Sequence, residues 1–232
     1  MLNKSLDRLA LALDTSDWPT YLRWCRYFGP RVGVLKVGLE AFTRWGLRAV
    51  EMARRDANGL FLDLKLHDIP NTVHGAVAAA RDQGVDYVTV HSAGGPAMLE
   101  AAQAAAGDSL KLLAVTLLTH LDREALVTLD MPGDGARRVK RWAAMARRAG
   151  CAGVVCSPLE LTALRVENPP PFLLVTPGIR LGEGEAHDQR RVSTPTEALQ
   201  SGADLLVVGR PVTRAADPER ALEALAQEMG RF

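Results

Sequence analysis

Charged residues interrupt the end of an apolar run at residues 60–73, LFLDLKLHDIPNTV. Asp63 and Lys65 are two positions apart, and this spacing places both side chains on the same face of a β-strand. Aspartate and lysine are rarely buried unless they are paired. Such a pair is either a structural ion pair or a means of keeping the lysine protonated and fixed in direction. Taken alone, the spacing favours the structural explanation.

Two further charged residues favour a functional role for this pair over a purely structural one. Lys36 lies in the apolar run of residues 32–38, and Asp68 follows Lys65 by three positions. Two lysines and two aspartates can alternate into a neutral array in which each charge has an opposite neighbour. Such an array keeps Lys65 protonated, and four charges beside buried strands are hard to explain by packing. The pattern therefore favours a reacting centre built on Asp63, Lys65, Asp68 and Lys36.

Glycines and arginines near the end of the chain form a second candidate site. TPGIR contains Gly178 and Arg180, and VVGRPVT contains Gly209 and Arg210. Glycine lets a backbone approach an anion closely, and the planar guanidinium of arginine can bind two phosphate oxygens at once. We expect residues 181–189, which are rich in glycine, to form a mobile lid. The competing explanation is a glycine-rich surface loop with scattered arginines.

The histidines and cysteines predict no metal site. They are His67, His74, His91, His120, His187, Cys25, Cys151 and Cys156, and they form no HExxH, HxH or CxxC pattern. His67 should face away from Asp63 and Lys65 if the strand geometry continues, so we expect it to be structural. His91 ends another apolar run, and we expect a satisfied core histidine there.

Composition excludes several classes of protein. The chain has 232 residues, of which 47% are hydrophobic and 24% are charged, and its formal net charge is +1. This balance produces no global field that attracts nucleic acid or an anionic membrane. We expect the basic stretch at residues 134–150 to be the solvated face of an outer helix. No apolar stretch approaches the roughly 20 residues of a membrane helix, and no secretory signal is recognisable, so we expect a reduced, cytoplasmic protein.

The elements that would position these residues follow a repeating order of short apolar runs and helical stretches. The runs are continuous rather than alternating, which is typical of strands buried on both faces of a parallel sheet. Eight runs occur, at residues 9–14, 32–38, 59–65, 85–91, 110–116, 151–157, 171–178 and 203–210. Helical periodicity marks residues 19–28, 41–56, 72–84, 96–107, 134–150, 195–202 and 218–230.

Eight strands alternating with helices indicate a (β/α)₈ TIM barrel, which we expect to span residues 1–232 as a single domain. An open, doubly wound sheet is the alternative, but no GxGxxG motif follows the first run. Active sites of such barrels lie at the C-terminal ends of the strands, and phosphate often binds to the loops after strands seven and eight. Asp14, Lys36, Asp63 and Lys65 stand at strand ends, and the two glycine–arginine motifs stand in those loops.

The segment FLDLKLHDIPNTV closely resembles the signature of the orotidine 5'-phosphate decarboxylase family. The resemblance extends along nearly the whole chain. Further blocks similar to that family, in the family's order, are LALD, LKVGLEAF, TVHSAGG, LLAVTLLT, TPGIR, DQRRV and VVGRPVT. Sibling enzymes that act on phosphorylated sugars share the DxKxxD motif, whereas the combination of DxKxxDIPNT, TPGIR and VGRPVT is highly specific.

This resemblance implies a homodimeric barrel that decarboxylates orotidine 5'-monophosphate to UMP without a metal or an organic cofactor. By position, Lys65 would protonate C6 of the pyrimidine as carbon dioxide leaves, and Asp63 would lie against the scissile carboxylate. Lys36 would hold the charged network and contact the ribose, and Asp14 would bind a ribose hydroxyl.

The resemblance also implies roles for residues outside the charged centre. Asp68, Ile69 and Thr72 match positions that reach into the neighbouring subunit's site, and Thr119 matches a residue that reads the edge of the pyrimidine. The positions that match the phosphate site are Arg180, Gln189, Gly209 and Arg210. The expected partners are therefore a nucleotide substrate and a second copy of the chain, with no nucleic acid and no membrane.

Two other functions remain open at this point. The first is a sibling barrel enzyme, a magnesium-dependent decarboxylase of keto-sugar phosphates, against which DIPNT and DQRRV argue. The second is a non-catalytic protein that binds a phosphorylated ligand. Such a protein would be expected to lose a charge from the set of Lys36, Asp63, Lys65 and Asp68, and all four are present. Fold alone does not decide among the three functions.

Overall fold

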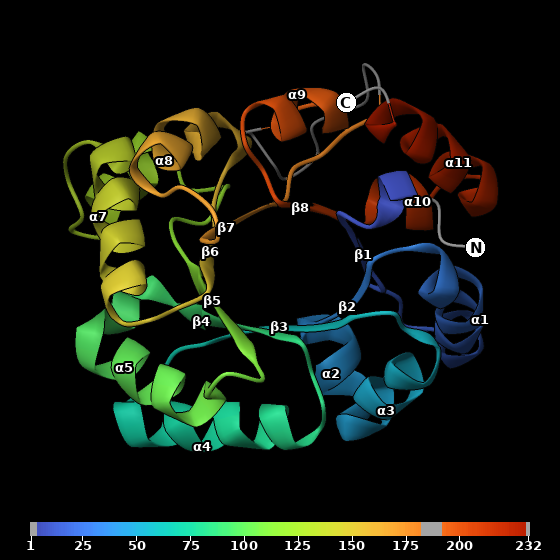
Figure 1. The fold of residues 1–232 in the computed structure, drawn as a ribbon, viewed down its shortest axis with the longest axis horizontal. Coiled ribbons are helices and arrows are strands. Elements are labelled where there is room, and N and C mark those ends of the chain that lie inside the picture. The colour runs from blue at the N-terminus through green and yellow to red at the C-terminus, as the bar shows by residue number, and fades with distance from the viewer. Residues whose placement is uncertain (1–3, 182–191, 231–232) are drawn as a thin grey trace.

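The computed structural model describes residues 4–181 and 192–230, and its centre is a closed barrel of eight parallel strands. The strands are β1 (Leu9–Ala12), β2 (Val34–Gly38), β3 (Leu60–Leu66), β4 (Tyr87–His91), β5 (Lys111–Val115), β6 (Gly153–Val155), β7 (Leu173–Thr176) and β8 (Leu205–Val208). Each strand pairs with the next, and Leu9 of β1 lies opposite Leu206 of β8, which closes the ring in Figure 1. The predicted (β/α)₈ barrel is confirmed.

Helices surround the barrel on the outside (Figure 1). They are α1 (Trp18–Phe28), α2 (Leu39–Trp45), α3 (Leu47–Asp56), α4 (Pro70–Asp82), α5 (Gly95–Ala106), α6 (Arg123–Thr128), α7 (Gly135–Arg148), α8 (Leu161–Glu167), α9 (Pro195–Gln200), α10 (Arg210–Thr213) and α11 (Pro218–Met229). Short 3₁₀ helices are η1 (Lys4–Leu6), η2 (Gly29–Arg31), η3 (Ser92–Gly94) and η4 (Pro158–Glu160). The helical stretches expected from the sequence did not include α6, α8 or α10.

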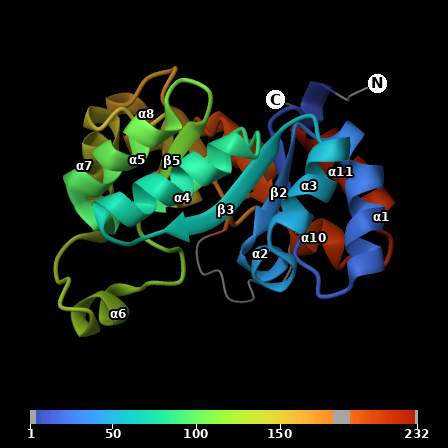
Figure 2. The same ribbon diagram turned by 90° about the horizontal axis from the view of Figure 1, so that it is seen from below.

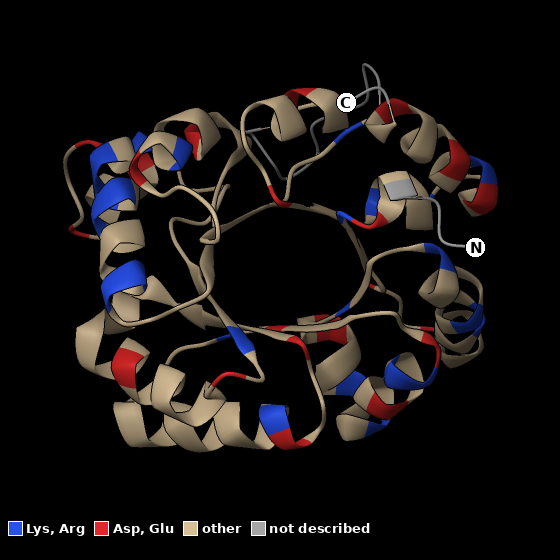
Figure 3. Cartoon of the chain, in the orientation of Figure 1, with Lys and Arg blue, Asp and Glu red and all other residues tan. Residues whose placement is uncertain are grey.

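The basic stretch forms α7, on whose ribbon the Lys and Arg positions are coloured blue in Figure 3. Arg137 and Arg141 are exposed, whereas Val139 and Ala143 are buried against the rest of the molecule. The expected outer helix with a solvated basic face is confirmed. Within the described residues, no helix is both long enough and apolar enough to cross a membrane.

The single helix expected over residues 41–56 is wrong. Gly46 separates α2 from α3, and its φ of 57° lies in the left-handed region that glycine adopts without strain. The N–H of Gly46 donates to the carbonyl of Phe42 at 2.7 Å, which ends α2. The apolar periodicity continues across the break, so the pattern alone does not reveal it.

Apolar side chains pack on both surfaces of the barrel wall. The inner cluster consists of Ala10, Val34, Phe61, Leu113, Val175 and Leu205. Val88 and Val90 of β4 belong instead to the outer cluster, which packs against the helices. Because successive strand residues point to opposite surfaces and both are buried, the strands read as continuous apolar runs.

The side view in Figure 2 shows toward which end of the barrel β3 runs. The arrow of β3 points toward the end of the barrel at which α2 and α6 lie. β1 stops at Ala12, two residues earlier than expected, so Asp14 lies in the loop that follows the strand. Lys36, Asp63 and Lys65 lie within β2 and β3, whereas Thr119 and Arg180 lie in the loops that follow β5 and β7.

Candidate active site

A cavity of about 520 Å³ opens at the C-terminal ends of the strands. The predicted site residues that line it are Asp14, Lys36, Asp63, Lys65, Thr119, Arg180, Gly209 and Arg210. The two candidate sites inferred from the sequence are therefore parts of one cavity. Gln189 and residues 182–189 of the expected lid lie outside the described residues.

Asp63 is the centre of the charged part of the cavity. Its Oδ1 lies 2.8 Å from Nζ of Lys65, and its Oδ2 lies 3.2 Å from Nζ of Lys36. The side chain of Asp63 is 14% exposed and that of Lys36 is 8% exposed, whereas Lys65 is 31% exposed. One carboxylate thus holds two ammonium groups, and the Lys65 ammonium is the more accessible of the two.

Asp14 adds a further charge to this array, beside Lys36. Asp68, the fourth charge expected from the sequence, is exposed and does not line the cavity of the single chain, so its part in the array stays a prediction. A Cβ atom added to Gly38 would lie 2.8 Å from Oδ1 of Asp14 and 3.0 Å from Nζ of Lys36. The absence of a side chain at Gly38 therefore lets a carboxylate and an ammonium group approach each other. Gly38 itself was not predicted as a site residue, although it follows Lys36 by only two positions.

Opposing effects set the ionisation of this array. Burial raises the pKa of Asp63, but the charges of Lys36 and Lys65, with hydrogen bonds from Lys65 and Thr89, outweigh burial and lower that pKa to about 2. Burial also disfavours the charged form of Lys36, yet attraction by Asp63 and then by Asp14 raises the pKa of Lys36 above its ordinary value. At neutral pH, Asp63 is ionised and Lys36 is protonated.

A bulge in β3 aims Lys65 at Asp63. Lys65 has a φ of 50°, a left-handed conformation that is uncommon for a residue with a side chain. The prediction that Asp63 and Lys65 lie side by side is confirmed, but by an irregular strand rather than by the regular two-residue period. The sequence contains no glycine or proline at this point that would indicate the bulge.

The two histidines near the site form a ring stack. The centroids of His67 and His91 are 5.3 Å apart, with 20° between the ring planes. His67 is exposed, and neither histidine lines the cavity. The prediction of a core histidine at position 91 is wrong, because His91 is only part-buried. Burial, followed by the charges of His67 and Lys65, lowers the pKa of His91 below its ordinary value of 6.5.

The TPGIR motif is held against the segment that precedes α9. Ile179 pairs with Ser193 in an isolated bridge, and the N–H of Arg180 donates to the carbonyl of Ser193 at 3.0 Å. Gly178 has a φ of 84°, which requires glycine for an unstrained turn. Arg180 is only 9% exposed and lines the cavity, so it belongs to the site and is not one of the arginines scattered over the surface.

The VVGRPVT motif adjoins the charged array. A Cβ atom added to Gly209 would lie 3.3 Å from the Cβ of Ala12 and 3.9 Å from Oδ2 of Asp14. Gly209 therefore lets the chain after β8 pass close to the loop after β1. Arg210 follows in α10 and lines the same cavity. Arg214 lines the cavity as well, so three arginines and the lysine–aspartate array share it.

Three predicted residues do not line the cavity of this single chain. Asp68, Ile69 and Thr72 are exposed at the junction of β3 and α4, and Ile69 is 67% exposed. Oδ1 of Asp68 accepts a hydrogen bond of 2.6 Å from the N–H of Ile69. Their predicted contact with a neighbouring subunit involves a second chain, so it stays a prediction.

The described residues offer no ready metal site. Within residues 4–181 and 192–230, no group of three or more His, Cys, Asp and Glu side chains is placed to hold an ion. The cysteines are unpaired and buried, and burial raises the pKa of Cys25 and of Cys151 to about 12. Among the described residues that line the cavity, Cys156 is the one cysteine. Burial raises the pKa of its thiol well above the ordinary value, so the thiol is protonated at neutral pH.

Comparison with known proteins identifies the family. Residues 7–225 match the model of the family described as "Orotidine 5'-phosphate decarboxylase / HUMPS family". The chain belongs to this family. A protein of Moorella thermoacetica named orotidine 5'-phosphate decarboxylase is 46% identical over 96% of this chain and 92% of its own length. A protein of the same name from Thermobifida fusca is 47% identical over 95% of both chains.

Solved structures agree with this assignment. The crystal structure of orotidine 5'-phosphate decarboxylase from Lactobacillus acidophilus is similar with a TM-score of 0.82 and 34% identity, over 95% of this chain and 98% of that one. The enzyme of the same name from Pyrococcus horikoshii OT3 has a TM-score of 0.77 and covers 96% of this chain and 99% of its own. At 21% identity, that likeness supports the fold alone. The resemblance seen in the sequence is confirmed, and the protein is an enzyme of the carbon–carbon lyase class.

Proposed function

We propose that this enzyme decarboxylates orotidine 5'-monophosphate to UMP and carbon dioxide, the last step of de novo pyrimidine nucleotide synthesis. The observation that carries the proposal is the Lys36–Asp63–Lys65 array in a cavity that Arg180 and Arg210 also line. A nucleotide with a carboxylated base at one end and a phosphate at the other matches this distribution of charge. The names of the relatives support the same substrate.

The proposed chemistry depends on stabilising charge at C6. Departure of carbon dioxide leaves an electron pair on a vinylic carbon with little delocalisation. Lys65 stabilises that charge as it develops, because an ammonium group fixed in a low-dielectric cavity does not have to reorganise. The same ammonium then gives its proton to C6, which yields UMP and a neutral lysine that is reprotonated from solvent. No metal or organic cofactor takes part in this proposal.

Asp63 has two tasks in this proposal. It holds Lys65 in position at 2.8 Å, and it faces the scissile carboxylate of the substrate. Because the pKa of Asp63 is about 2, the side chain is negatively charged when the substrate binds. Repulsion between the two carboxylates is relieved when carbon dioxide leaves, which is a form of ground-state destabilisation.

The remaining cavity residues bind and orient the nucleotide. Lys36 and Asp14 contact the ribose, and Thr119 reads the edge of the pyrimidine. The phosphate binds at Arg180, Gln189, Gly209 and Arg210. Binding energy from the phosphate is used to organise the reacting end of the molecule, so removal of the phosphate should lower kcat as well as raise KM.

We include a homodimer in the proposed function. Asp68, Ile69 and Thr72 lie exposed beside the site, and an isoleucine that is 67% exposed is suited to burial by a second copy of the chain. In the dimer these three residues reach the neighbouring cavity. The cytoplasm is the proposed location, a reducing compartment in which buried, unpaired cysteines are expected.

The test is turnover of orotidine 5'-monophosphate in excess chelator, followed by absorbance, with UMP identified as the product. The proposal predicts sustained turnover that added magnesium does not increase. A parallel assay offers keto-sugar phosphates with magnesium, the substrates of the sibling enzymes. Turnover of the sugar phosphates alone, or no turnover of the nucleotide by a well-folded dimer, would overturn the proposal.

A further inference from the structure

Thr89 occupies an unusual place in β4. It is fully buried in the middle of an apolar strand, between Val88 and Val90. Those two valines face the helix layer, and Tyr87 packs against the inner cluster beside Phe61. Since side chains alternate along a strand, Thr89 points into the barrel. A hydroxyl in this position needs hydrogen-bond partners, and its partners are residues of the charged array.

The register of β3 against β4 explains why Thr89 meets that array. Leu62 lies opposite Val88 and Leu66 lies opposite Val90, so three residues of β3 face the single residue Thr89. The strand is therefore bulged at Asp63, Leu64 and Lys65. Bulges are frequent beside active sites, where they redirect a side chain, but they leave backbone groups without their ladder partners. A side chain opposite the bulge can supply the missing partner.

The hydroxyl of Thr89 makes two hydrogen bonds across the bulge. It accepts one from the backbone N–H of Lys65 at 2.9 Å and donates one to Oδ1 of Asp63 at 2.9 Å. The same Oδ1 accepts the bond of 2.8 Å from Nζ of Lys65. The Oγ1 atom of Thr89 thus contacts two groups. One is the backbone of Lys65, which has a left-handed conformation, and the other is the carboxylate of Asp63, toward which the Lys65 side chain points.

We propose that Thr89 is a positioning residue that holds Lys65 and Asp63 in their reactive geometry, an inference that rests on the proposed function. Thr89 does not line the cavity, so it acts through these two residues and not on the substrate. A threonine with a merely structural role would affect stability without affecting kcat. A positioning role affects kcat, because a misplacement of about 1 Å at a reacting group can lower a rate roughly a hundredfold.

The experiment compares Thr89→Val with Thr89→Ser. Valine keeps the branched shape but removes the hydroxyl, whereas serine keeps the hydroxyl. We expect Thr89→Val to lower kcat for orotidine 5'-monophosphate by about a hundredfold while KM changes by less than about threefold. Thr89→Ser should recover most of the lost kcat. Thr89→Ala serves as a second variant without the hydroxyl, in case the valine variant does not fold.

Thr116→Val is the matched control. Thr116 is also fully buried at a neighbouring strand end, and its hydroxyl donates to the carbonyl of Val155 at 2.9 Å without touching the charged array. This variant should lose stability to a similar degree as Thr89→Val and keep kcat. Equal losses of kcat in both variants, or a kcat of Thr89→Val within about twofold of wild type, would overturn the positioning role.

A readout that needs no substrate separates this inference from the proposed function. Carbon-13 NMR of the aspartate carboxyls, assigned with Asp63→Asn, should show a higher pKa for Asp63 in Thr89→Val, because a hydrogen bond to the carboxylate is lost. An unchanged pKa would mean that the hydroxyl does not hold Asp63. If wild type turns over no nucleotide, the proposed function fails, and the titration still decides whether Thr89 holds the array.

Discussion

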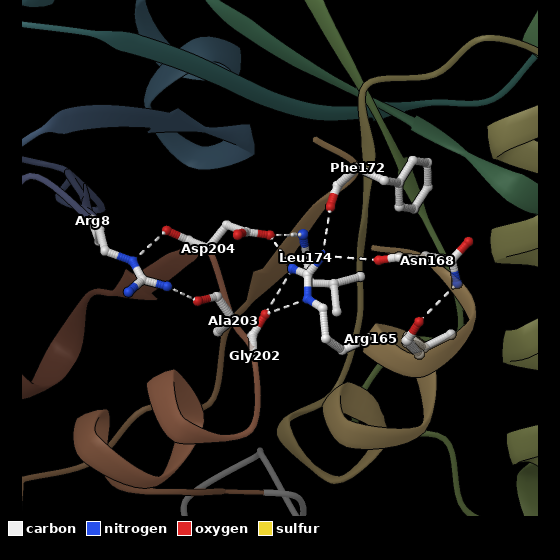
Figure 4. A network of polar contacts seen from close by, with 9 residues as sticks. Arg8, Arg165, Asn168, Phe172, Leu174, Gly202, Ala203 and Asp204 are labelled. Atoms are coloured by element: carbon white, nitrogen blue, oxygen red, sulfur yellow. Dashed lines mark hydrogen bonds and ion pairs between the residues drawn. The ribbon is translucent and has the colours of Figure 1, made fainter. Parts of the chain in front are cut away.

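Two aspartates in this barrel each contact two cationic side chains, and they lie at opposite ends of the strands. Asp63, near the C-terminal end of β3, pairs with two lysines. Asp204, directly before β8, pairs with Arg165, and its backbone carbonyl accepts a hydrogen bond of 3.2 Å from Nε of Arg8. Figure 4 shows this second cluster, which we call the Asp204 network. The two clusters have similar charges but different surroundings.

The Asp204 network fastens backbone segments to one another. Every guanidinium nitrogen of Arg165 donates a hydrogen bond, and Oδ2 of Asp204 accepts one of 2.7 Å from the N–H of Leu174 in β7. The carbonyls that accept from Arg165 are those of Asn168, Phe172 and Gly202. This cluster therefore joins the segments that lead into β7 and β8.

The Asp63 array instead borders open space. Both of its lysines line the 520 Å³ cavity, which neither Arg165 nor Asp204 does. Arginine, with five donors in a rigid plane, suits a site at which every donor meets a fixed carbonyl. Lysine presents a compact charge on a flexible stem, which suits a site at which the charge acts on a ligand. The surroundings of a charge cluster, together with the choice of lysine or arginine, therefore indicate its task.

The largest expected effect comes from Lys65→Ala. Its kcat for orotidine 5'-monophosphate should fall by about a thousandfold or more, since the proposed mechanism assigns both charge stabilisation and proton donation to Lys65. Its Tm should change by only about 3 °C, because the side chain is 31% exposed and pairs at the cavity surface. Steady-state kinetics and calorimetry measure the two effects.

Lys111→Ala is the control for this prediction. Lys111 is an exposed lysine at the start of β5, at the other end of the barrel, where its ammonium lies 5.0 Å from the ring centroid of Tyr87. Its removal should leave kcat unchanged. A loss of less than about tenfold in Lys65→Ala would contradict the role of the Lys65 ammonium.

Arg165→Met should have the largest effect on stability. Methionine fills part of the space but leaves Asp204 and three backbone carbonyls without their donor. We expect the free energy of unfolding to fall by about 3 kcal/mol and Tm to fall by roughly 6–12 °C. Measured well below its Tm, kcat should stay at the wild-type value. Urea unfolding that shows a loss under about 1 kcal/mol would contradict this role.

The contribution of Asp63 to stability should depend on pH. Its pKa is lowered from 3.8 to about 2 in the folded protein, so its ionised form stabilises the fold above pH 3.8, and this stabilisation is lost as pH falls through 2. The shift corresponds to roughly 2 kcal/mol. In urea unfolding, the difference between wild type and Asp63→Asn should shrink by about this amount between pH 5 and pH 2. A difference that stays constant with pH would contradict the assignment.

The smallest effect on stability is expected for Arg54→Met. This variant tests whether burial determines how much a structural ion pair contributes to stability. Asp86 precedes β4 as Asp204 precedes β8, and its Oδ2 accepts from the N–H of Leu60 at 2.7 Å and from Nη1 of Arg54 at 3.1 Å. The side chains of this ion pair are 44% and 41% exposed. Its loss should therefore cost at most about 1 kcal/mol. A cost equal to that of Arg165→Met would show that burial does not distinguish the two pairs.

The part of the site that follows from strand order was predictable from the sequence. In a closed parallel barrel, the C-terminal ends of all strands gather at one end, so polar residues there meet whatever their distance in the chain. Asp14, Lys36, Asp63 and Arg210 line one cavity for this reason. The glycine–arginine motifs also lie where the eight-strand pattern places them.

Features that depend on local departures from regularity were not predictable. The bulge at Lys65 carries no glycine or proline signal, and the role of Thr89 exists only because of that bulge. Asp68 lies beyond the bulged strand and is exposed in the single chain, and the carboxylate near Lys36 on the side of Gly38 is that of Asp14. Arg165 of the Asp204 network is likewise bound to distant backbone carbonyls, and such contacts leave no periodic pattern in a sequence.

The most direct test of the division between the two clusters is a double-mutant cycle. It measures kcat for orotidine 5'-monophosphate and the free energy of unfolding in wild type, Lys65→Ala, Arg165→Met and the double variant. Our account predicts that Lys65→Ala determines the change in kcat, that Arg165→Met determines the change in stability, and that the effects add within about 0.5 kcal/mol. A loss of turnover in Arg165→Met comparable to that in Lys65→Ala, or equal destabilisation by both, would contradict it.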